Sequence, residues 1–344
     1  MSSERRLILE KIADEAGVSV RTVQRVLSNA LKESRPSAAA RASAIRAIAT
    51  RYGYLPNHAA KAVRTGRFGA VALLSSADPT RKVLFPGMLW ALQSGLRERG
   101  VHLILAQMPE GEVSRTEDLP VFLRQASVDG LLVYHNRSVP AGLIRAIRGC
   151  RLPTVWVNIK RGADCVYPDD FDAAKRATEL LIDHGHREIA MLSFATGDHY
   201  SRADREKGYK QALASYALKP RIERVTPANL PMGDRAAAAA AWLKKRRATG
   251  VVCYEQRDAM PLLTAALRLG LRVPGDLSVV CMHDAEADLA GITIDTLQIP
   301  TERMGQAAVE MLDAKIEDQA APLSPRVLGF EHRRGATVGQ PLTP

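Results

Sequence analysis

Four polar side chains near the N-terminus have the types and spacing of a surface that binds nucleic acid. Arg21, Gln24, Arg25 and Ser28 recur at i, i+3, i+4 and i+7, which places them on one face of a helix. An arginine on such a face can pair with guanine through two hydrogen bonds. The pattern therefore predicts a helix that enters the major groove of DNA.

Two short helices are needed to hold this face against DNA, and the sequence supplies both. Gly17 can enter the left-handed region without strain, so it is predicted to end the first helix, and Ser19 is predicted to cap the second. Together they form a helix-turn-helix, and a third helix closed by Gly53 completes a small headpiece. The first helix is indicated by apolar residues at helical spacing, namely Leu9, Ile12, Ala13 and Ala16.

The distribution of charge separates DNA binding from the plainer interpretation, an amphipathic helical hairpin whose arginines only face water. Residues 1–67 hold thirteen Lys and Arg against five Asp and Glu, a net charge of +8. The rest of the chain holds 35 against 32, a net charge of +3. A basic end on a nearly neutral body is typical of a module that docks on phosphate.

Length and composition predict a soluble, cytoplasmic protein of two or three domains. The chain has 344 residues and 46% apolar content, enough for substantial cores. No apolar export signal follows the basic start, and no run reaches the roughly 18 apolar residues of a membrane span. No Cys-x-x-Cys pair occurs, and four scattered cysteines are interpreted as reduced core residues: Cys150, Cys165, Cys253 and Cys281.

After residue 68 short apolar runs alternate with helical stretches, which predicts an α/β fold. Such runs are typical of buried parallel strands joined by crossover helices. The expected architecture is two doubly wound lobes. Strands are predicted at 69–74, 101–106, 130–134, 153–158, 188–193, 250–254 and 277–282. Helices are predicted at 85–100, 116–126, 171–185, 202–216, 233–247 and 257–270.

The sequence offers little support for catalysis. It has no Gly-x-Gly-x-x-Gly after the first strand, no phosphate-binding Gly-x-x-x-x-Gly-Lys loop and no Gly-x-Ser-x-Gly elbow. The nearest approach to a metal site is His184-Gly-His186, which is better interpreted as a helix stop before a strand because no third ligand lies nearby. We therefore expect no enzyme activity, no cofactor and no metal.

The motifs of the N-terminal segment resemble those of the lactose-repressor (LacI/GalR) family of bacterial transcription regulators. The resemblance rests on Ile12-Ala-Asp-Glu-Ala-Gly-Val-Ser19, Thr22-Val23, Arg25-Val26 and Tyr54-Leu-Pro-Asn57, and it extends along nearly the whole chain. It implies a headpiece at 1–56, a hinge helix and linker at 57–67, and at 68–338 a two-lobed parallel-sheet core similar to periplasmic sugar-binding proteins. One lobe would comprise 68–168 and 298–324, the other 169–297 and 325–338.

The resemblance also implies the partners and the DNA-binding residues. The chain should act as a homodimer or larger assembly on double-stranded operator DNA with two-fold symmetry, and the hinge helix should form only on DNA. Val63 stands where the family usually has a leucine wedge between base pairs, and a shorter wedge unstacks them less. The implied DNA-binding residues are Ser19, Val20, Arg21, Thr22, Arg25, Ser28, Tyr54, Asn57, His58, Ala60, Val63 and Arg64.

The core should bind a small effector in the cleft between its lobes, at residues that partly depart from the family pattern. Glu255 follows Tyr254 where an asparagine is usual, and His283 replaces an aspartate. These side chains suit a polyhydroxylated ligand such as a sugar, with an affinity that varies between about pH 5.5 and 7.5. Trp156 could add an apolar face. The implied effector-binding residues are Phe85, Asp169, Arg205, Glu255 and His283.

The predicted function is a transcription regulator, a repressor, that a carbohydrate effector controls. One alternative is a sugar-binding receptor without a DNA function. The other is a sugar-modifying enzyme with an accessory DNA-binding head.

Overall fold

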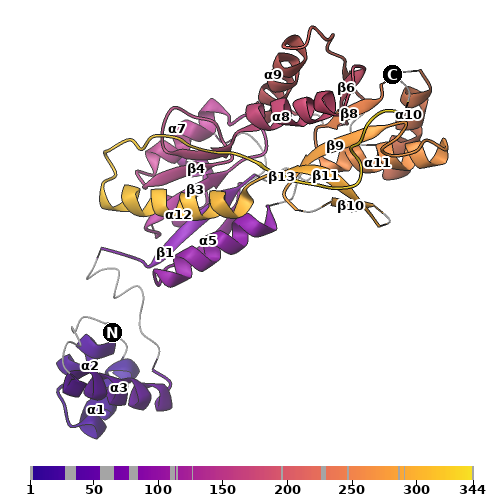
Figure 1. The fold of residues 1–344 in the computed structure, drawn as a ribbon. Helices are drawn as coiled ribbons and strands as arrows, with labels where there is room; N and C mark the ends of the chain where they lie inside the picture. The colour runs from indigo at the N-terminus through magenta and orange to yellow at the C-terminus, as the bar shows by residue number, and fades with distance from the viewer. Residues whose placement is uncertain are drawn as a thin grey trace. The chain divides into compact units, whose positions relative to one another are not determined.

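The fold comes from a computed structural model of the chain (Figure 1). It forms two compact units, Met1–Gly69 and Ala70–Pro344. The structure describes residues 3–27, 36–54, 66–76, 84–108, 113, 115–125, 127–194, 197–225, 230–245, 248–285, 287–289 and 291–342. Within these residues no helix combines the length and the apolar character that a bilayer crossing requires.

The N-terminal unit is the predicted three-helix headpiece, built from α1 (Ser3–Ala16), α2 (Val20–Leu27) and α3 (Pro36–Arg51). Gly17, with a φ of +62°, ends α1 and reverses the chain before α2. Tight packing explains why so short a segment folds. The apolar sides of the three helices meet in one core made of Leu9, Ile12, Ala13, Val23, Val26, Ala42, Ile45, Ile48 and Ala49.

The first lobe of the larger unit is a six-stranded sheet in which every neighbouring pair is parallel. Helices α5 (Pro86–Glu98) and α12 (Thr301–Glu317) cover one face, and α7 (Ala141–Gly149) covers the other. The strand order is β12 (Arg326–Leu328), β5 (Cys165–Pro168), β4 (Thr154–Val157), β3 (Gly130–Tyr134), β1 (Ala70–Ser75) and β2 (His102–Gln107).

The second lobe repeats this plan. Helices α8 (Asp170–Asp183) and α9 (Tyr200–Ala214) pack on one face, and α10 (Met232–Lys245) and α11 (Gln256–Arg268) on the other. The two doubly wound lobes predicted from the alternating runs are therefore confirmed. The strands run β10 (Ala287–Leu289), β11 (Ile292–Gln298), β9 (Ser278–His283), β8 (Gly250–Cys253), β6 (Ile189–Ser193) and β7 (Ile222–Arg224), with β13 (Glu331–Arg333) antiparallel to β11.

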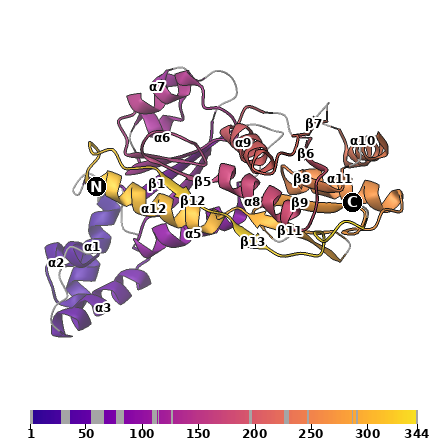
Figure 2. The same ribbon diagram turned by 45° about the horizontal axis from the view of Figure 1, so that its top comes forward.

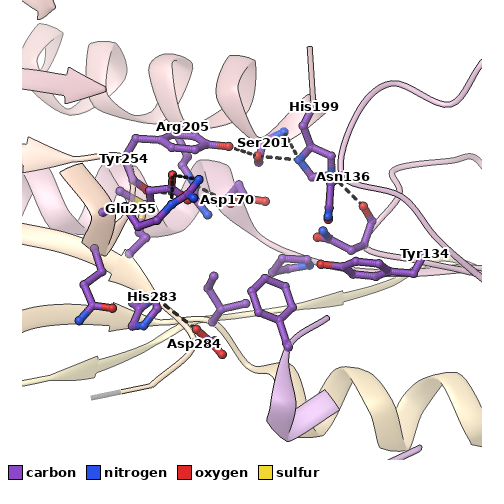
Figure 3. Close-up of a pocket in the computed structure, with 17 residues that line it drawn as sticks. Tyr134, Asn136, Asp170, His199, Ser201, Arg205, Tyr254, Glu255, His283 and Asp284 are labelled. Atoms are coloured by element: carbon purple, nitrogen blue, oxygen red, sulfur yellow. Dashed lines mark hydrogen bonds and ion pairs between the residues drawn. The ribbon is translucent and has the colours of Figure 1, made fainter. Parts of the chain in front are cut away.

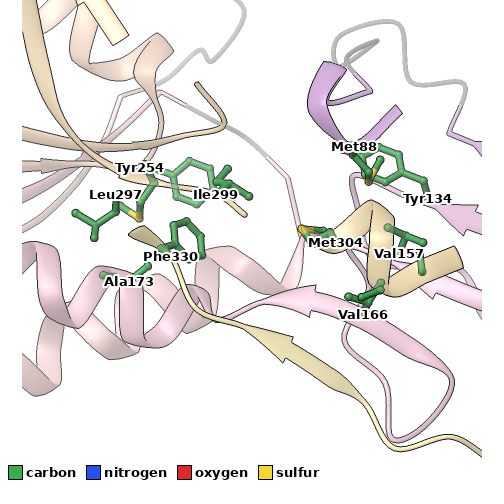
Figure 4. Packing of buried hydrophobic residues seen from close by; sticks show 14 of the residues in the cluster. Met88, Tyr134, Val157, Val166, Ala173, Tyr254, Leu297, Ile299, Met304 and Phe330 are labelled. Atoms are coloured by element: carbon green, nitrogen blue, oxygen red, sulfur yellow. The ribbon is translucent and has the colours of Figure 1, made fainter. Parts of the chain in front are cut away.

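The chain passes between the lobes after β5, after β11 and after β12 (Figure 2). Phe330, 4% exposed, lies on the last crossing and packs with Leu297 and Tyr254, while Met304 lies on the side of Val157 (Figure 4). One apolar cluster thus extends across both lobes, and it supports the groups that line the space between them.

Two predictions are wrong, namely the end of the first lobe and one of its helices. The first lobe continues to Leu328 instead of ending at 324, because β12 joins the first sheet beside β5. This strand has only three residues and no apolar run. The helix predicted at 116–126 is a 3₁₀ turn (Thr116–Asp118) followed by α6 (Val121–Arg124), and Pro120 between them cannot donate the hydrogen bond that a continuous helix needs.

Candidate functional site

Helix α2 presents a polar, cationic face to solvent. Val23 and Val26 are buried in the headpiece core, with exposures of 0% and 2%. Arg21, Gln24 and Arg25 lie on the opposite side and are exposed. The face that the sequence predicts for base contact is therefore accessible, as major-groove entry requires.

The turn before α2 is held by hydroxyl groups. The Thr22 backbone N–H donates to Ser19 Oγ at 3.2 Å, and the two side-chain hydroxyls lie 2.9 Å apart. Ser19 therefore caps α2 as predicted. Val20 and Tyr54 are partly buried against the headpiece core, so these two residues support the orientation of α2 as well as being candidates for DNA contact.

The remaining predicted DNA contacts lie outside the described residues. They are Ser28 and the positions predicted to form the hinge helix, Asn57, His58, Ala60, Val63 and Arg64. Their roles stay predictions.

A cavity of about 180 Å³ lies in the larger unit where strands of both lobes end. Tyr134 ends β3 and Pro168 ends β5, while Tyr254 directly follows β8 and His283 ends β9. This is the edge at which open parallel sheets bind ligands. The wall consists of Phe85, Tyr134, Asn136, Asn158, Pro168, Asp170, His199, Ser201, Arg205, Tyr254, Glu255, Gln256, Arg257, Met282, His283, Asp284 and Ile299 (Figure 3).

Four of the predicted effector residues line this cavity: Phe85, Arg205, Glu255 and His283. Asp169 does not. It is the N-cap of α8, and its Oδ1 accepts the backbone N–H of Asp172 at 3.0 Å. The next residue, Asp170, lines the cavity in its place.

Trp156, the aromatic face considered for the ligand, also lies elsewhere. It belongs to the apolar cluster between the first sheet and α7. The Phe85 ring does line the cavity and meets Tyr134 edge to face, with centroids 6.2 Å apart. The aromatic surface of the cavity therefore comes from Phe85, Tyr134 and Tyr254.

The Arg205 guanidinium is bound by protein groups. Its Nε donates to Asp170 Oδ1 at 2.7 Å, and Nη1 donates to the Tyr254 carbonyl oxygen. It also stacks over the Tyr254 ring, with Cζ 4.4 Å from the centroid. Two of the three guanidinium nitrogens of Arg205 therefore bind protein groups and order the wall of the cavity, and the role of Arg205 in effector binding stays a prediction.

The Asp170 carboxylate is buried between Arg205 and Tyr200. Its side chain is 1% exposed, and Oδ2 itself has no accessible surface. Burial, followed by the charge of Asp170 and a hydrogen bond to it, raises the pKa of the Tyr200 hydroxyl well above its usual value. A buried carboxylate oxygen is costly unless something donates to it, and the Tyr200 hydroxyl is the protein group placed to do so.

A chain of hydrogen bonds crosses the cavity wall. His199 Nε2 lies 2.9 Å from the Asn158 carbonyl oxygen, which can only accept, so Nε2 carries a proton. In the neutral ring Nδ1 then accepts from Ser201 Oγ at 2.7 Å, and Ser201 accepts from the Tyr254 hydroxyl at 2.7 Å. This network fixes the orientation of Tyr254. Its members lie far apart in the sequence, so no local pattern could have predicted the network.

The opposite wall carries two close pairs of polar side chains. His283 Nδ1 lies 3.2 Å from Asp284 Oδ1, and Arg257 Nη2 lies 3.2 Å from Glu255 Oε1. Burial lowers the pKa of His283, although the charges of Asp284 and Glu255 oppose this effect. The imidazole is therefore neutral near pH 7 and can act as a donor or as an acceptor.

Behind this wall Asp258 is fully buried at the start of α11. It accepts the backbone N–H groups of Phe194 at 2.9 Å and of Glu255 at 3.2 Å. Burial and the nearby Glu255 charge raise the pKa of Asp258 to about 8. Asp258 thus fixes the backbone that carries Glu255 into the cavity.

The pair His184 and His186 has a structural role. His184 is the C-cap of α8, and Gly185 has a φ of +94°. His186 is buried, with Nδ1 2.9 Å from Thr249 Oγ1 and Nε2 3.0 Å from the Gly339 carbonyl oxygen. Among the described residues no group of three His, Cys, Asp or Glu side chains is placed to hold a metal ion.

Known proteins share both the sequence and the fold. Residues 178–338 match the model of a periplasmic binding protein-like domain. The transcriptional regulator CelR of Thermobifida fusca is 30% identical over 330 residues, covering 92% of this chain and 94% of that protein. The transcriptional repressor PurR of Vibrio vulnificus is 26% identical over 321 residues, covering 90% and 92%.

Solved structures agree with the observed fold. A lac repressor dimer bound to operator and an anti-inducer has a TM-score of 0.76 at 20% identity, and it covers 95% of this chain and 98% of that one. A CelR–cellobiose complex has a TM-score of 0.66 at 24% identity, covering 96% and 99%. This chain has a helix-turn-helix headpiece and a two-lobed core, and it is 30% identical to the regulator CelR over nearly its whole length. It therefore belongs to the lactose-repressor (LacI/GalR) family of bacterial transcription regulators.

Proposed function

We propose that this protein is a sequence-specific DNA-binding repressor whose affinity for its operator is set by a small polyhydroxylated effector, a sugar or sugar derivative. The effector proposal rests on the cavity where strands of both lobes end, whose wall combines the polar side chains of Glu255, Gln256 and His283 with aromatic rings. A ligand rich in hydroxyl groups can donate to and accept from such side chains. The related CelR structure is a complex with cellobiose, which supports the same class of ligand.

The headpiece at 1–56 would bind the DNA, and the segment 57–67 would act as a hinge. Arg21 and Arg25 are exposed on α2 and can reach base edges. Ser19 and Thr22 at the start of the helix can contact phosphate. Two copies of this helix, related by two-fold symmetry, would read an operator with the same symmetry.

An apolar surface on the first lobe supports pairing of two chains. Trp90 on α5 is 67% exposed, and Leu105 and Ile104 on the edge strand β2 are 56% and 37% exposed. An exposed edge strand with apolar side chains is a ready site for association. We propose that these residues contribute to the homodimer.

The cavity suits hydroxyl groups on one side and ring faces on the other. Glu255, Gln256 and His283 offer acceptors and donors, while Phe85 and Tyr134 offer apolar surface. The Glu255 carboxylate is held by Arg257, which favours a binding role over acid–base catalysis. We therefore propose that the effector leaves the cavity chemically unchanged.

Selection of duplex DNA from a random pool by the purified full-length protein tests the DNA proposal. We expect a motif with two-fold symmetry. Arg25→Ala should relax one position in each half-site, whereas Arg41→Ala, an exposed arginine on α3, should leave the motif unchanged. Selection of no motif, or of the same motif by all three proteins, would contradict this docking.

A thermal-shift screen of carbohydrates tests the effector proposal. A ligand should stabilise the wild type and the control His184→Asn, which alters the end of α8 outside the cavity, but stabilise His283→Asn less. Equal stabilisation of all three proteins would place the ligand elsewhere. Recovery of the ligand by mass spectrometry checks for turnover, and a modified product would support an enzyme.

A further inference from the structure

A second cavity, of about 470 Å³, lies in the first lobe away from the carboxyl ends of its strands. It is bordered by the end of α7, the start of β4, the loop between β4 and β5, and the end of α12. The residues that line it are Ile147, Arg148, Arg151, Leu152, Thr154, Trp156, Arg161, Gly162, Ala163, Asp164, Lys315 and Gln319.

Cations outnumber anions around this cavity. Arg148, Arg151, Arg161 and Lys315 face a single carboxylate, Asp164. That carboxylate is already engaged, because its Oδ1 accepts the Leu323 backbone N–H at 2.9 Å and lies 3.4 Å from Lys315 Nζ. The three guanidinium groups therefore lack a matching negative charge in the wall.

The arginines have no carboxylate partners elsewhere in the described part of the chain. Arg148 and Arg151 are both exposed, and the structure shows no ion pair for either of them within the described residues. Arg161 lies over the Trp156 ring, with Cζ 4.5 Å from the ring centroid. Burial and the neighbouring charge of Arg148 lower the pKa of Arg161. An anion placed between these groups would relieve their mutual repulsion.

Hydrogen bonds to backbone carbonyl groups hold the other walls of this cavity. Lys315 is 5% exposed, and its Nζ donates to the carbonyl oxygens of Gln319 and Ala321 at 2.8 and 2.9 Å. Gln319 Nε2 in turn donates to the Arg151 carbonyl oxygen at 2.8 Å. These bonds join the end of α12 to the segment that carries Arg151. They hold the backbone of this part of the wall in place.

We propose that this cavity is a second ligand site, distinct from the cavity between the lobes, for a small molecule that carries a phosphate group. Guanidinium groups bind phosphate oxygens through paired, charge-assisted hydrogen bonds. The cavity is larger than one phosphate needs, and Ile147, Leu152 and Trp156 give it an apolar side. This side accommodates the organic part of a phosphate ester.

The loop between β4 and β5 connects the two cavities. Asn158, at its start, lines the cavity between the lobes and accepts from His199 through its carbonyl oxygen at 2.9 Å. Residues Arg161 to Asp164 line the second cavity. Both ligands therefore contact the same short segment, and through it each can change the affinity for the other.

Titration of the full-length protein with pyrophosphate tests the site. Ionic strength is held constant with sodium chloride, and binding is followed by calorimetry and by tryptophan fluorescence. The test variant is Arg148→Gln/Arg151→Gln, and the control is Arg145→Gln, an exposed arginine on α7 outside the cavity. A second control, Trp156→Phe, identifies the tryptophan that reports binding, because Trp242 lies in the second lobe and Trp90, on α5, does not line the cavity.

We expect saturable binding of one pyrophosphate per chain to the wild type and to Arg145→Gln. In the double variant the Kd should rise at least about tenfold, the effect of losing one or more charge-assisted hydrogen bonds. The fluorescence change should disappear in Trp156→Phe. Glucose 6-phosphate should compete with pyrophosphate, whereas glucose should not.

Two results would overturn the proposal. Equal pyrophosphate binding by the wild type, the double variant and the Arg145→Gln control would indicate an adventitious ion only. Unchanged pyrophosphate binding with weakened binding of duplex DNA in the double variant would assign the arginines to the DNA backbone. Neither result affects the carbohydrate screen or the operator selection, so this proposal fails independently of the proposed function.

Discussion

Removing one partner of the buried ion pair between Arg205 and Asp170 should strongly destabilise the larger unit. The two side chains are only 6% and 1% exposed, and Arg205 Nε lies 2.7 Å from Asp170 Oδ1. Arg205→Met would leave the carboxylate buried without this donor, and it would also remove the donor to the Tyr254 carbonyl oxygen. Asp170→Asn would instead leave the guanidinium buried without its counter-charge.

Breaking a buried pair on one side costs about 3–5 kcal/mol, because an uncompensated charge remains. We expect a loss of that size for Arg205→Met. The double variant Arg205→Met/Asp170→Asn carries no lone charge, so its loss should be smaller than the sum of the two single losses by about 1–3 kcal/mol. Arg257→Met is the control, since its pair with Glu255 is about half exposed at the arginine and should contribute less than about 1 kcal/mol.

Urea denaturation followed by circular dichroism measures these free energies, and thermal unfolding should show losses of about 2–4 °C per kcal/mol for a unit of this size. A loss for Arg205→Met no larger than that for Arg257→Met, or two single losses that simply add, would show that the buried pair does not behave as a coupled unit. Arg205→Met should also reduce effector binding, because it disturbs the wall that contains Tyr254.

Other predictions concern DNA contact and pH. Arg21→Ala and Arg25→Ala should each cost about 1–3 kcal/mol of base discrimination at symmetric operator positions, measured with single-base operator variants. Ala60→Gly should weaken operator binding by about 1 kcal/mol through added chain entropy without changing effector affinity, and equal operator affinity would argue against a hinge that folds on DNA. Burial lowers the pKa of His283 from 6.5, so the change in effector affinity that His283 causes, measured by calorimetry as the difference between the wild type and His283→Asn, should be centred below pH 6.5; a His283-dependent change centred above pH 7 would contradict this. The raised pKa of Asp258, about 8 against 3.8 when unfolded, means that its contribution to stability is complete below pH 3.8 and is lost as the pH rises through 8. Asp258→Asn should remove this part of the pH dependence of the urea midpoint, and an unchanged profile would reject it.

The sequence predicts local patterns well because they depend on neighbours along the chain. The two faces of α2 follow from residues three and four positions apart, and the structure shows Val23 buried and Arg21 exposed as expected. The buried strands were predictable for the same reason. Strand β12 was not, since its three residues become a strand only through pairing with β5.

The ligand cavity shows where sequence reasoning fails. Asp169 and Asp170 are adjacent, and which of them faces the cavity depends on the residue at which α8 begins. At a helix start a shift of one residue turns a side chain by about 100°. The pairing of Arg205 with a carboxylate 35 residues away also depends on the packing of α8 against α9, which no local pattern encodes.

The lowered pKa of His283 also changes an expectation. The sequence predicted an effector affinity that varies between about pH 5.5 and 7.5, as for a histidine with an ordinary pKa beside carboxylates. Burial shifts the titration of His283 to lower pH in spite of Asp284 and Glu255. The expected window therefore moves below pH 6.5.

We propose that the cavity between the lobes is coupled to operator DNA within one chain. The most direct test measures the operator Kd of the full-length protein while the carbohydrate that most raises its melting temperature is added up to saturation. We expect the operator Kd to change by about fivefold or more, and the carbohydrate affinity to change by the same factor when operator is bound, because linkage is reciprocal. An operator Kd that stays constant at saturating carbohydrate would contradict this coupling.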